Sequence, residues 1–158
     1  MSRIKWCLKQ KRGIELIESN EDLARAYIKK AENALRAASD LQNNLDWEIS
    51  SSYYAMYFSL YAILIRIGIK SEIHSCTIEF MREFLKDYFS EKDISLIEKT
   101  QKVRIDVQYY SDRDVSKELY NKIKKQRALF LAKCKDVLNQ ISEDLVKTIR
   151  RKIKEYYN

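Results

Sequence analysis

Arg104 is the residue of this sequence whose position most strongly suggests chemistry. The segment from Glu91 to Tyr110 is predicted to be a helix, with Ser90 as its N-cap and Asp93 three residues further on. At about 100° per residue, one broad arc of this helix is apolar, and Arg104 falls near the middle of that arc. The apolar residues of the arc are Ile94, Leu96, Ile97, Val103, Ile105, Val107 and Tyr110.

A guanidinium on an apolar face must be compensated, because an unpaired buried charge costs on the order of several kcal/mol. A charge that is kept at such a cost is a candidate binding or catalytic group. Two alternatives remain open from the sequence. Arg104 can form a structural salt bridge, or its stem can pack while its head reaches water.

The composition predicts one domain built from long helices. The chain has 158 residues, of which 46% are hydrophobic and 34% charged, and this balance excludes a disordered chain. It has no Pro and only two Gly, too few turn residues for a β-rich or α/β domain. We expect an all-α protein of four to five long helices with short connections.

The cysteines and the single histidine indicate neither a disulfide framework nor a metal site. Cys7, Cys76 and Cys134 are odd in number and far apart, so we expect small buried hydrophobic residues in a reducing cytoplasm. The only histidine is His74, and no paired-cysteine motif accompanies it. We therefore expect a cytoplasmic protein with no metal and no cofactor.

Apolar periodicity and end signals place the helices that must position Arg104. The first helix begins after Ser19 or Asn20 and runs to about Leu41. A third helix extends from about His74 to Phe89, and the Arg104 helix is the fourth. A fifth segment covers about 115–138 and can continue to Ile153.

The second helix is predicted to be the central rod of the bundle. Residues 49–65 are 17 consecutive uncharged residues, a length at the lower limit of a membrane span. Four serines and four tyrosines interrupt this run, and Glu48 and Arg66 flank it closely, so we expect no membrane span. Gly68 is predicted to end the helix at the C′ position.

Two terminal segments are expected to lie outside the bundle. In residues 1–19 the alternation of Ile4, Trp6 and Leu8, followed by a turn at 11–13, predicts a short hairpin or an irregular segment. The bundle itself is assigned to residues 20–140. Residues 141–158 are predicted to form a basic, helical C-terminal tail.

The whole excess of positive charge lies near the C-terminus. The net charge is +7, and residues 113–158 carry 13 Lys and Arg against 6 Asp and Glu. The tail can bind a nucleic-acid backbone, an acidic protein surface or anionic lipid, or it can simply be a solvated helix face. RNA bound in this way would be held without sequence specificity. The basic residues of the tail are Lys147, Arg150, Arg151, Lys152 and Lys154.

The run SSYYAMYFSLYAILIRIGIKSEIHSCTIEFM, residues 51–81, resembles the HEPN (higher eukaryotes and prokaryotes nucleotide-binding) domain family. The shared features are a Tyr- and Ala-rich helix, a turn with Gly and a His-Ser start of the next helix. The first helix, ARAYIKKAENALRAA at residues 24–38, is similar to the opening helix of the family. The resemblance covers about residues 20–140 and implies an all-α, up-and-down helical bundle that forms a homodimer.

The resemblance also implies a function. Many members of the family are encoded beside a minimal nucleotidyltransferase and act as the toxin of a toxin–antitoxin pair. Active members are metal-independent ribonucleases, whose motif is an Arg followed, after four to six residues, by a His. The Arg holds a phosphate and the His carries a proton. In some members the partner modifies a tyrosine near the motif.

Arg104 matches the Arg of that motif, within RIDVQYY, but the His is missing. Tyr109, Tyr110 and Ser111 occupy its positions, and tyrosine is a poor general base at pH 7. The leading hypothesis is a nucleotide- or RNA-associated regulatory module that uses Arg104, Tyr109 and Tyr110 and is paired with a nucleotidyltransferase. The alternatives are a ribonuclease toxin built on Arg104 and a non-catalytic helical scaffold. Sequence alone does not bring His74 beside Arg104.

Overall fold

Long helices dominate the structure, as the composition predicts. The computed structural model describes residues 1–158 and shows an all-α protein with one two-stranded sheet. It has seven helices rather than four or five, because each terminal segment forms a helix of its own. The elements in chain order are α1 (Arg3–Lys9), β1 (Glu15–Leu16), α2 (Glu21–Asp40), α3 (Leu45–Ile67), β2 (Ile69–Lys70), α4 (His74–Phe84), α5 (Glu91–Tyr109), α6 (Lys117–Gln140) and α7 (Glu143–Glu155).

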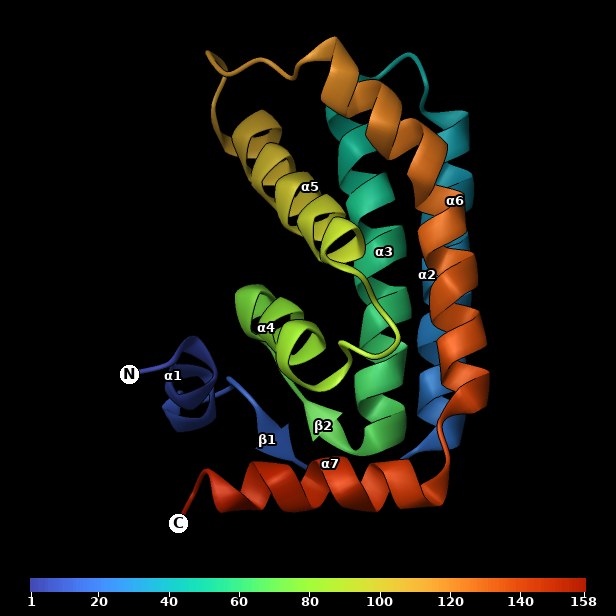
Figure 1. Ribbon diagram of the computed structural model, residues 1–158. Helices are drawn as coiled ribbons and strands as arrows, with labels where there is room; N and C mark the ends of the chain where they lie inside the picture. Colours follow the sequence, from blue (N-terminus) through green and yellow to red (C-terminus); the bar gives the residue numbers. More distant parts are fainter.

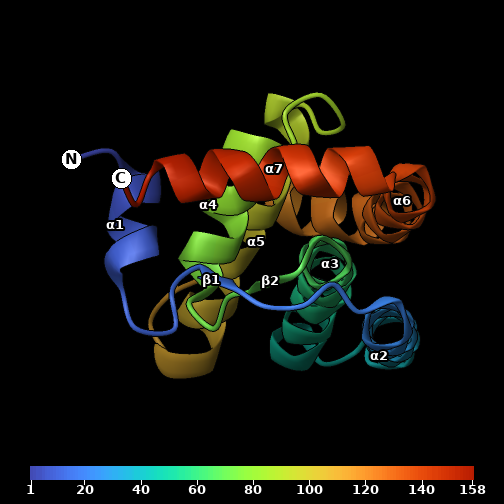
Figure 2. The ribbon, with the colours of Figure 1, turned by 90° about the horizontal axis from the view of Figure 1, so that it is seen from below.

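Helix α3 is the central rod of the bundle. Helices α2 and α6 lie alongside it, α5 leans across it, and α4 lies between α5 and the sheet (Figure 1). Helix α7 runs crosswise under one end of the bundle, where α2 and α3 are seen end-on in Figure 2. The uncharged run 49–65 therefore has neighbours on nearly every side and is almost wholly buried. None of the helices combines the length and the apolar character needed to cross a lipid bilayer.

Local capping fixes the helix ends that the sequence indicated. The Asn20 side chain accepts a hydrogen bond of 2.9 Å from the Leu23 amide at the start of α2. Ser90 and Asp93 form the predicted capping box at the start of α5. Gly68 ends α3 at φ +87°, a left-handed conformation that a residue with a side chain rarely adopts.

The N-terminal segment is a helix and a strand, so the predicted hairpin is wrong. Ile4, Cys7 and Leu8 are buried from one face of α1, and their spacing of three and one suits a helix. Strand β1 pairs antiparallel with β2, with Leu16 opposite Ile69, and not with a neighbour in residues 1–12. In so short a segment, period two and period 3.6 are hard to distinguish, and a distant partner cannot be detected.

A disulfide joins Cys7 of α1 to Cys76 of α4, with 5.5 Å between the two Cα atoms. The expectation that the cysteines are unbonded residues is therefore wrong for this pair. Only Cys134 is a free thiol, and it is buried as expected. The pairing was hidden because the two cysteines are 69 residues apart and meet only after α1 packs on α4.

Two helix ends differ from the predicted ones. Helix α4 ends at Phe84 rather than Phe89, and the fifth segment is divided into α6 and α7. Ser142 makes the division, since its hydroxyl accepts a 3.1 Å hydrogen bond from the Leu145 amide and caps α7. The buried face of α7 consists of Val146, Ile149 and Ile153.

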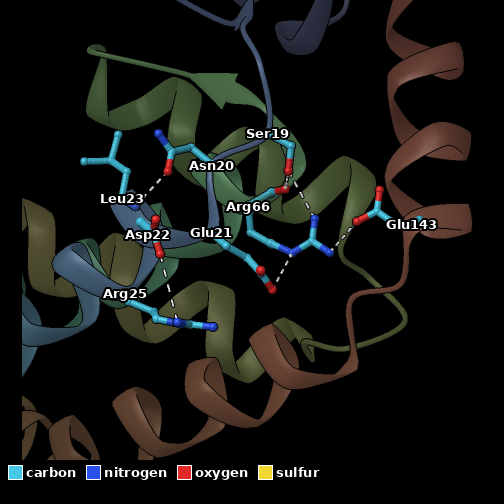
Figure 3. Close-up of polar contacts among 8 residues, drawn as sticks. All are labelled: Ser19, Asn20, Glu21, Asp22, Leu23, Arg25, Arg66 and Glu143. Atoms are coloured by element: carbon cyan, nitrogen blue, oxygen red, sulfur yellow. Dashed lines mark hydrogen bonds and ion pairs between the residues drawn. The ribbon is translucent and has the colours of Figure 1, made fainter.

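Arg66, at the end of α3, ties three segments together (Figure 3). Its guanidinium lies 2.8 Å from Glu143 Oε1 of α7 and 3.7 Å from Glu21 Oε1 of α2. It also donates a 3.1 Å hydrogen bond to the Ser19 hydroxyl. Because the side chain is buried and has acidic partners, its charge is compensated within the fold.

A second buried arginine, Arg127 of α6, pairs with Glu48 of α3. Arg127 Nη1 lies 2.9 Å from Glu48 Oε1 and 3.2 Å from the Ser52 hydroxyl. The Tyr120 hydroxyl donates a 2.6 Å hydrogen bond to the other oxygen of Glu48. Both charges of this pair are buried, and both have hydrogen-bond partners, as such pairs require.

Candidate functional site

The candidate site is built on the tyrosines of α3. Tyr53, Tyr54 and Tyr57 lie on neighbouring positions of one side of this helix, and Tyr53 and Tyr57 are buried. The rings of Tyr53 and Tyr57 stack with centroids 5.8 Å apart. The two helices that lean on this side, α4 and α5, contribute His74 and Arg104.

His74 is the first residue of α4 and is held from two directions. Its ring stacks on Tyr57, with centroids 4.0 Å apart and planes inclined by 15°. Its Nδ1 atom lies 2.7 Å from the Tyr53 hydroxyl. Stacking and this hydrogen bond together fix the orientation of the imidazole.

Burial determines the protonation of this pair. Burial raises the pKa of Tyr53 far above its ordinary value, so the hydroxyl keeps its proton. Burial, followed by the positive charge of Arg104, lowers the pKa of His74 to about 4, so the imidazole is neutral at pH 7. A neutral imidazole has one donor and one acceptor nitrogen, and we assign Nδ1 as the acceptor from Tyr53. The remaining proton then lies on Nε2.

Arg104 enters the same cluster from α5. Its guanidinium carbon lies 4.9 Å from the ring centroid of Tyr53 and 5.6 Å from that of Tyr54, within the range of cation–π contacts. Its Nη1 atom donates to Gln108 Oε1 at 3.0 Å and approaches the Tyr54 hydroxyl at 3.5 Å. Arg104 and His74 therefore flank the same two aromatic rings.

No carboxylate forms an ion pair with Arg104. All of its hydrogen bonds go to neutral groups, and its buried Nε atom has no hydrogen-bond partner. Arg66 and Arg127, by contrast, each pair with a glutamate. A structural salt bridge is therefore excluded for Arg104, and its charge is free to attract an anion.

Tyr109 and Tyr110 lie at the exposed end of α5. Their exposed fractions are 72% and 44%, and neither forms a hydrogen bond or a cation–π contact with Arg104. Tyr110 instead lies under the guanidinium of Arg113, 3.7 Å from its ring centroid. Tyr109 lines a surface hollow of about 210 Å³ together with Trp47 and Gln108. Gln108, which lines this hollow, is also the hydrogen-bond acceptor of Arg104.

The basic tail is remote from this cluster. Helix α7 crosses the far end of the bundle from the C-terminal half of α5 (Figures 1 and 2). Arg150 donates to the backbone carbonyls of Ile17 at 2.7 Å and Gly68 at 2.8 Å, so it takes part in the fold. The tail residues whose side chains are exposed are Lys147, Arg151, Lys152 and Lys154.

The surroundings of two side chains, His74 and Arg127, could not be placed from the sequence. His74 was noticed, but its place beside Arg104 depends on how α4 and α5 pack on α3. Arg127 lies between the buried residues Ile123 and Phe130 on the apolar face of α6. It carries the same signal that identified Arg104, a charge within an apolar stripe, and its partner Glu48 could have been suspected on that ground.

Comparison with known proteins identifies a family that agrees with the all-helical fold. The family model described as "HEPN domain" matches residues 24–137. A protein of Methanocaldococcus jannaschii named "Putative toxin MJ0142" is 30% identical over 126 residues, which are 76% of this chain and 83% of that protein. A protein of Archaeoglobus fulgidus named "UPF0332 protein" is 32% identical over 92 residues, 58% of this chain and 74% of that protein.

The match covers every element that forms the Arg104 cluster. Helices α3, α4 and α5 all lie within residues 24–137, and so do Tyr53, His74 and Arg104. Helices α1 and α7 lie outside the match. On the extent of this match, and on its all-helical fold, the chain belongs to the HEPN domain family.

Proposed function

We propose that this protein is a toxin-like HEPN module that binds the phosphate of a nucleotide or an RNA at Arg104. The name of the relative from Methanocaldococcus jannaschii supports the toxin-like role. Family membership supports the association with nucleotides. The proposed partner is a minimal nucleotidyltransferase, as the resemblance to family members implies.

One observation carries the proposal: the guanidinium of Arg104 has no carboxylate partner. It is half-buried between the rings of Tyr53 and Tyr54 and retains an unsatisfied donor. Removing such a group from water without a counter-charge is unfavourable for the free protein. A phosphate would supply the missing charge and accept hydrogen bonds from the fork of the guanidinium.

A homodimer is the proposed assembly. Leu45, Trp47, Tyr109 and Tyr110 are exposed at one end of the molecule, where α3 begins and α5 ends. Ile105 and Val107 of α5 are only partly covered. A two-fold contact across this end would cover these side chains and bring two Arg104 clusters toward each other.

Tyr109 and Tyr110 are the proposed sites of modification by the nucleotidyltransferase. Both side chains are exposed, and no hydrogen bond occupies either hydroxyl. A modifying enzyme could therefore reach them without unfolding α5.

A metal-independent ribonuclease is the second candidate. The observation that favours it is His74, which reaches the tyrosines of the Arg104 cluster from a different helix than the family motif predicts. A general base must offer a free lone pair to the attacking ribose hydroxyl. With Tyr53 donating to Nδ1 and the proton on Nε2, His74 has none, so binding is favoured over cleavage.

A binding titration tests the proposal. The probes are a fluorescent single-stranded RNA and ATP, each titrated at low salt with the wild-type protein, Arg104→Met and Lys102→Met. Lys102 is an exposed lysine of the same helix, so its replacement removes an equal charge outside the cluster. We expect Arg104→Met to weaken binding and Lys102→Met to leave it nearly unchanged. Equal binding by all three proteins would refute the role of Arg104.

A further inference from the structure

One nitrogen of the single histidine has no partner within the protein. The Nδ1 atom of His74 is held by Tyr53, and one ring face is covered by Tyr57, but Nε2 forms no hydrogen bond. The only buried side-chain nitrogen or oxygen without a partner is Arg104 Nε. His74 is only partly buried, so Nε2 keeps some contact with solvent, from which a ligand can approach it.

The polar side chains that lie against the same tyrosine rings as His74 can donate hydrogen bonds. Arg104 can only donate, and His74 carries its free proton on Nε2. The hydroxyl of Tyr54 lies 3.5 Å from Arg104 Nη1, for which it is the acceptor, so its own proton remains available. The ring of Tyr54 lies edge-to-face with His74, with centroids 6.3 Å apart. A cluster of donors without an acidic side chain is suited to an anion.

We propose that His74 and Tyr54 complete the Arg104 site, so that one phosphate group is bound by the guanidinium, the tyrosine hydroxyl and the imidazole Nε2–H. The ligand class is a phosphodiester or phosphate ester, as found in the RNA backbone and in nucleotides. The proposal rests on the proposed function, because it needs Arg104 to bind phosphate. It adds a second, titratable contact that the family motif does not contain.

Binding of phosphate should change the charge of His74. The groups that face the imidazole are Tyr53, Tyr54 and Tyr57 from α3 and Arg104 from α5, and of these only Arg104 is charged. In the empty site its positive charge disfavours a protonated imidazole. A bound phosphate brings a negative charge into hydrogen-bond contact with Nε2–H, offsets the charge of Arg104 and so favours the imidazolium. By linkage, the affinity for phosphate must then increase as the pH falls.

The size of this effect follows from the two pKa values. If phosphate returns the pKa of His74 from about 4 to its ordinary value of 6.5, a phosphodiester binds about tenfold more tightly at about pH 5.5 than at about pH 7.5. Oligouridylate is the suitable probe, because neither its phosphodiesters nor its bases titrate in this range. Because the chain has one histidine, a single imidazole signal in the NMR spectrum reports the pKa of His74 directly.

The experiment compares wild type, His74→Gln and Arg104→Met. Gln can still donate from its amide and accept from Tyr53, but it does not titrate, so its affinity should be independent of pH. Circular dichroism at each pH verifies the fold of each variant. Without ligand, Arg104→Met should raise the pKa of His74, because it removes the neighbouring positive charge. UDP is titrated beside oligouridylate, and the ligand that raises the pKa of His74 identifies the source of the phosphate.

The outcomes separate this inference from the proposed function. A wild-type gain at low pH that His74→Gln lacks, with a raised imidazole pKa in the complex, supports the inference. An unchanged imidazole pKa at saturation, or an equal gain in His74→Gln, overturns it, even if Arg104→Met weakens binding and the proposed function stands. If none of the variants loses binding, both this inference and the proposed function are overturned.

Discussion

Replacing Arg104 and Arg127 by methionine should have opposite consequences, although both arginines lie on apolar helix faces. Arg104→Met removes two cation–π contacts, with Tyr53 and Tyr54, worth about 0.5–1 kcal/mol each. It also removes the buried Nε donor, which has no partner and destabilises the wild-type protein by about 1–3 kcal/mol. These effects nearly cancel, so we expect the free energy of unfolding to change by about 1 kcal/mol or less in either direction.

Arg127→Met instead leaves the buried carboxylate of Glu48 without its cationic partner. Glu48 is 1% exposed and loses its only cationic partner, while the Tyr120 hydroxyl remains its sole strong donor. Breaking a buried pair in this way costs about 3–5 kcal/mol. The matched pair of variants therefore isolates the effect of a carboxylate partner.

Unfolding in guanidinium chloride and an RNA titration at low salt measure the two effects. We expect Arg104→Met to unfold near the wild-type midpoint but to bind RNA about 10- to 100-fold more weakly, since a charge-assisted hydrogen bond contributes about 1.5–3 kcal/mol. Arg127→Met, where it still folds, should bind RNA like wild type. A loss of about 3 kcal/mol or more in Arg104→Met, with RNA binding unchanged, would show that the arginine is structural and refute the anion site.

Four further outcomes follow from the structure. The dimer interface should bury at least about 1,200 Å² in total. Light scattering at micromolar concentration should show a dimer for wild type and a larger monomer fraction for Trp47→Glu, and a monomeric wild type would contradict this assembly. Generic single-stranded RNA incubated with EDTA should remain intact on a gel, whereas cleavage that disappears in Arg104→Ala would favour the ribonuclease. Cys7→Ser, which opens the disulfide to Cys76, should lower the free energy of unfolding by ~4 kcal/mol, since the bond closes a loop of 69 residues; an unchanged denaturation midpoint would argue against the bond. Because the pKa of His74 is lowered on folding to about 4 from 6.5, its contribution to stability is fully present above pH 6.5 and lost as the pH falls toward 4. The free energy of unfolding of wild type should therefore fall more steeply with decreasing pH than that of His74→Gln between pH 6.5 and 4, and parallel pH profiles would contradict the burial of the imidazole.

The sequence by itself determined the features that depend on neighbours along the chain. The ends of α2, α3 and α5 were predictable because Asn20, Gly68 and the Ser90–Asp93 pair act within one helical turn. The central position of α3 was predictable because a long run without charged residues is stable in a helical bundle only when neighbours cover it on all sides. Arg104 could be selected as a candidate from the sequence for the converse reason, because a charge on an apolar arc is costly.

Only the tertiary structure decided which distant residues meet. Leu16 pairs with Ile69, and Cys7 with Cys76, although more than fifty residues separate the members of each pair. Neither pairing has a local signal, because each forms only when segments far apart in the sequence pack together.

The candidate site was decided in the same way. His74 and Arg104 belong to different helices, and they become neighbours because both lean on the tyrosines of α3. The sequence could show that Arg104 needs a counter-charge, but not that every carboxylate lies elsewhere. That depends on the packing of the whole bundle, which brings tyrosines, and no acid, to the guanidinium.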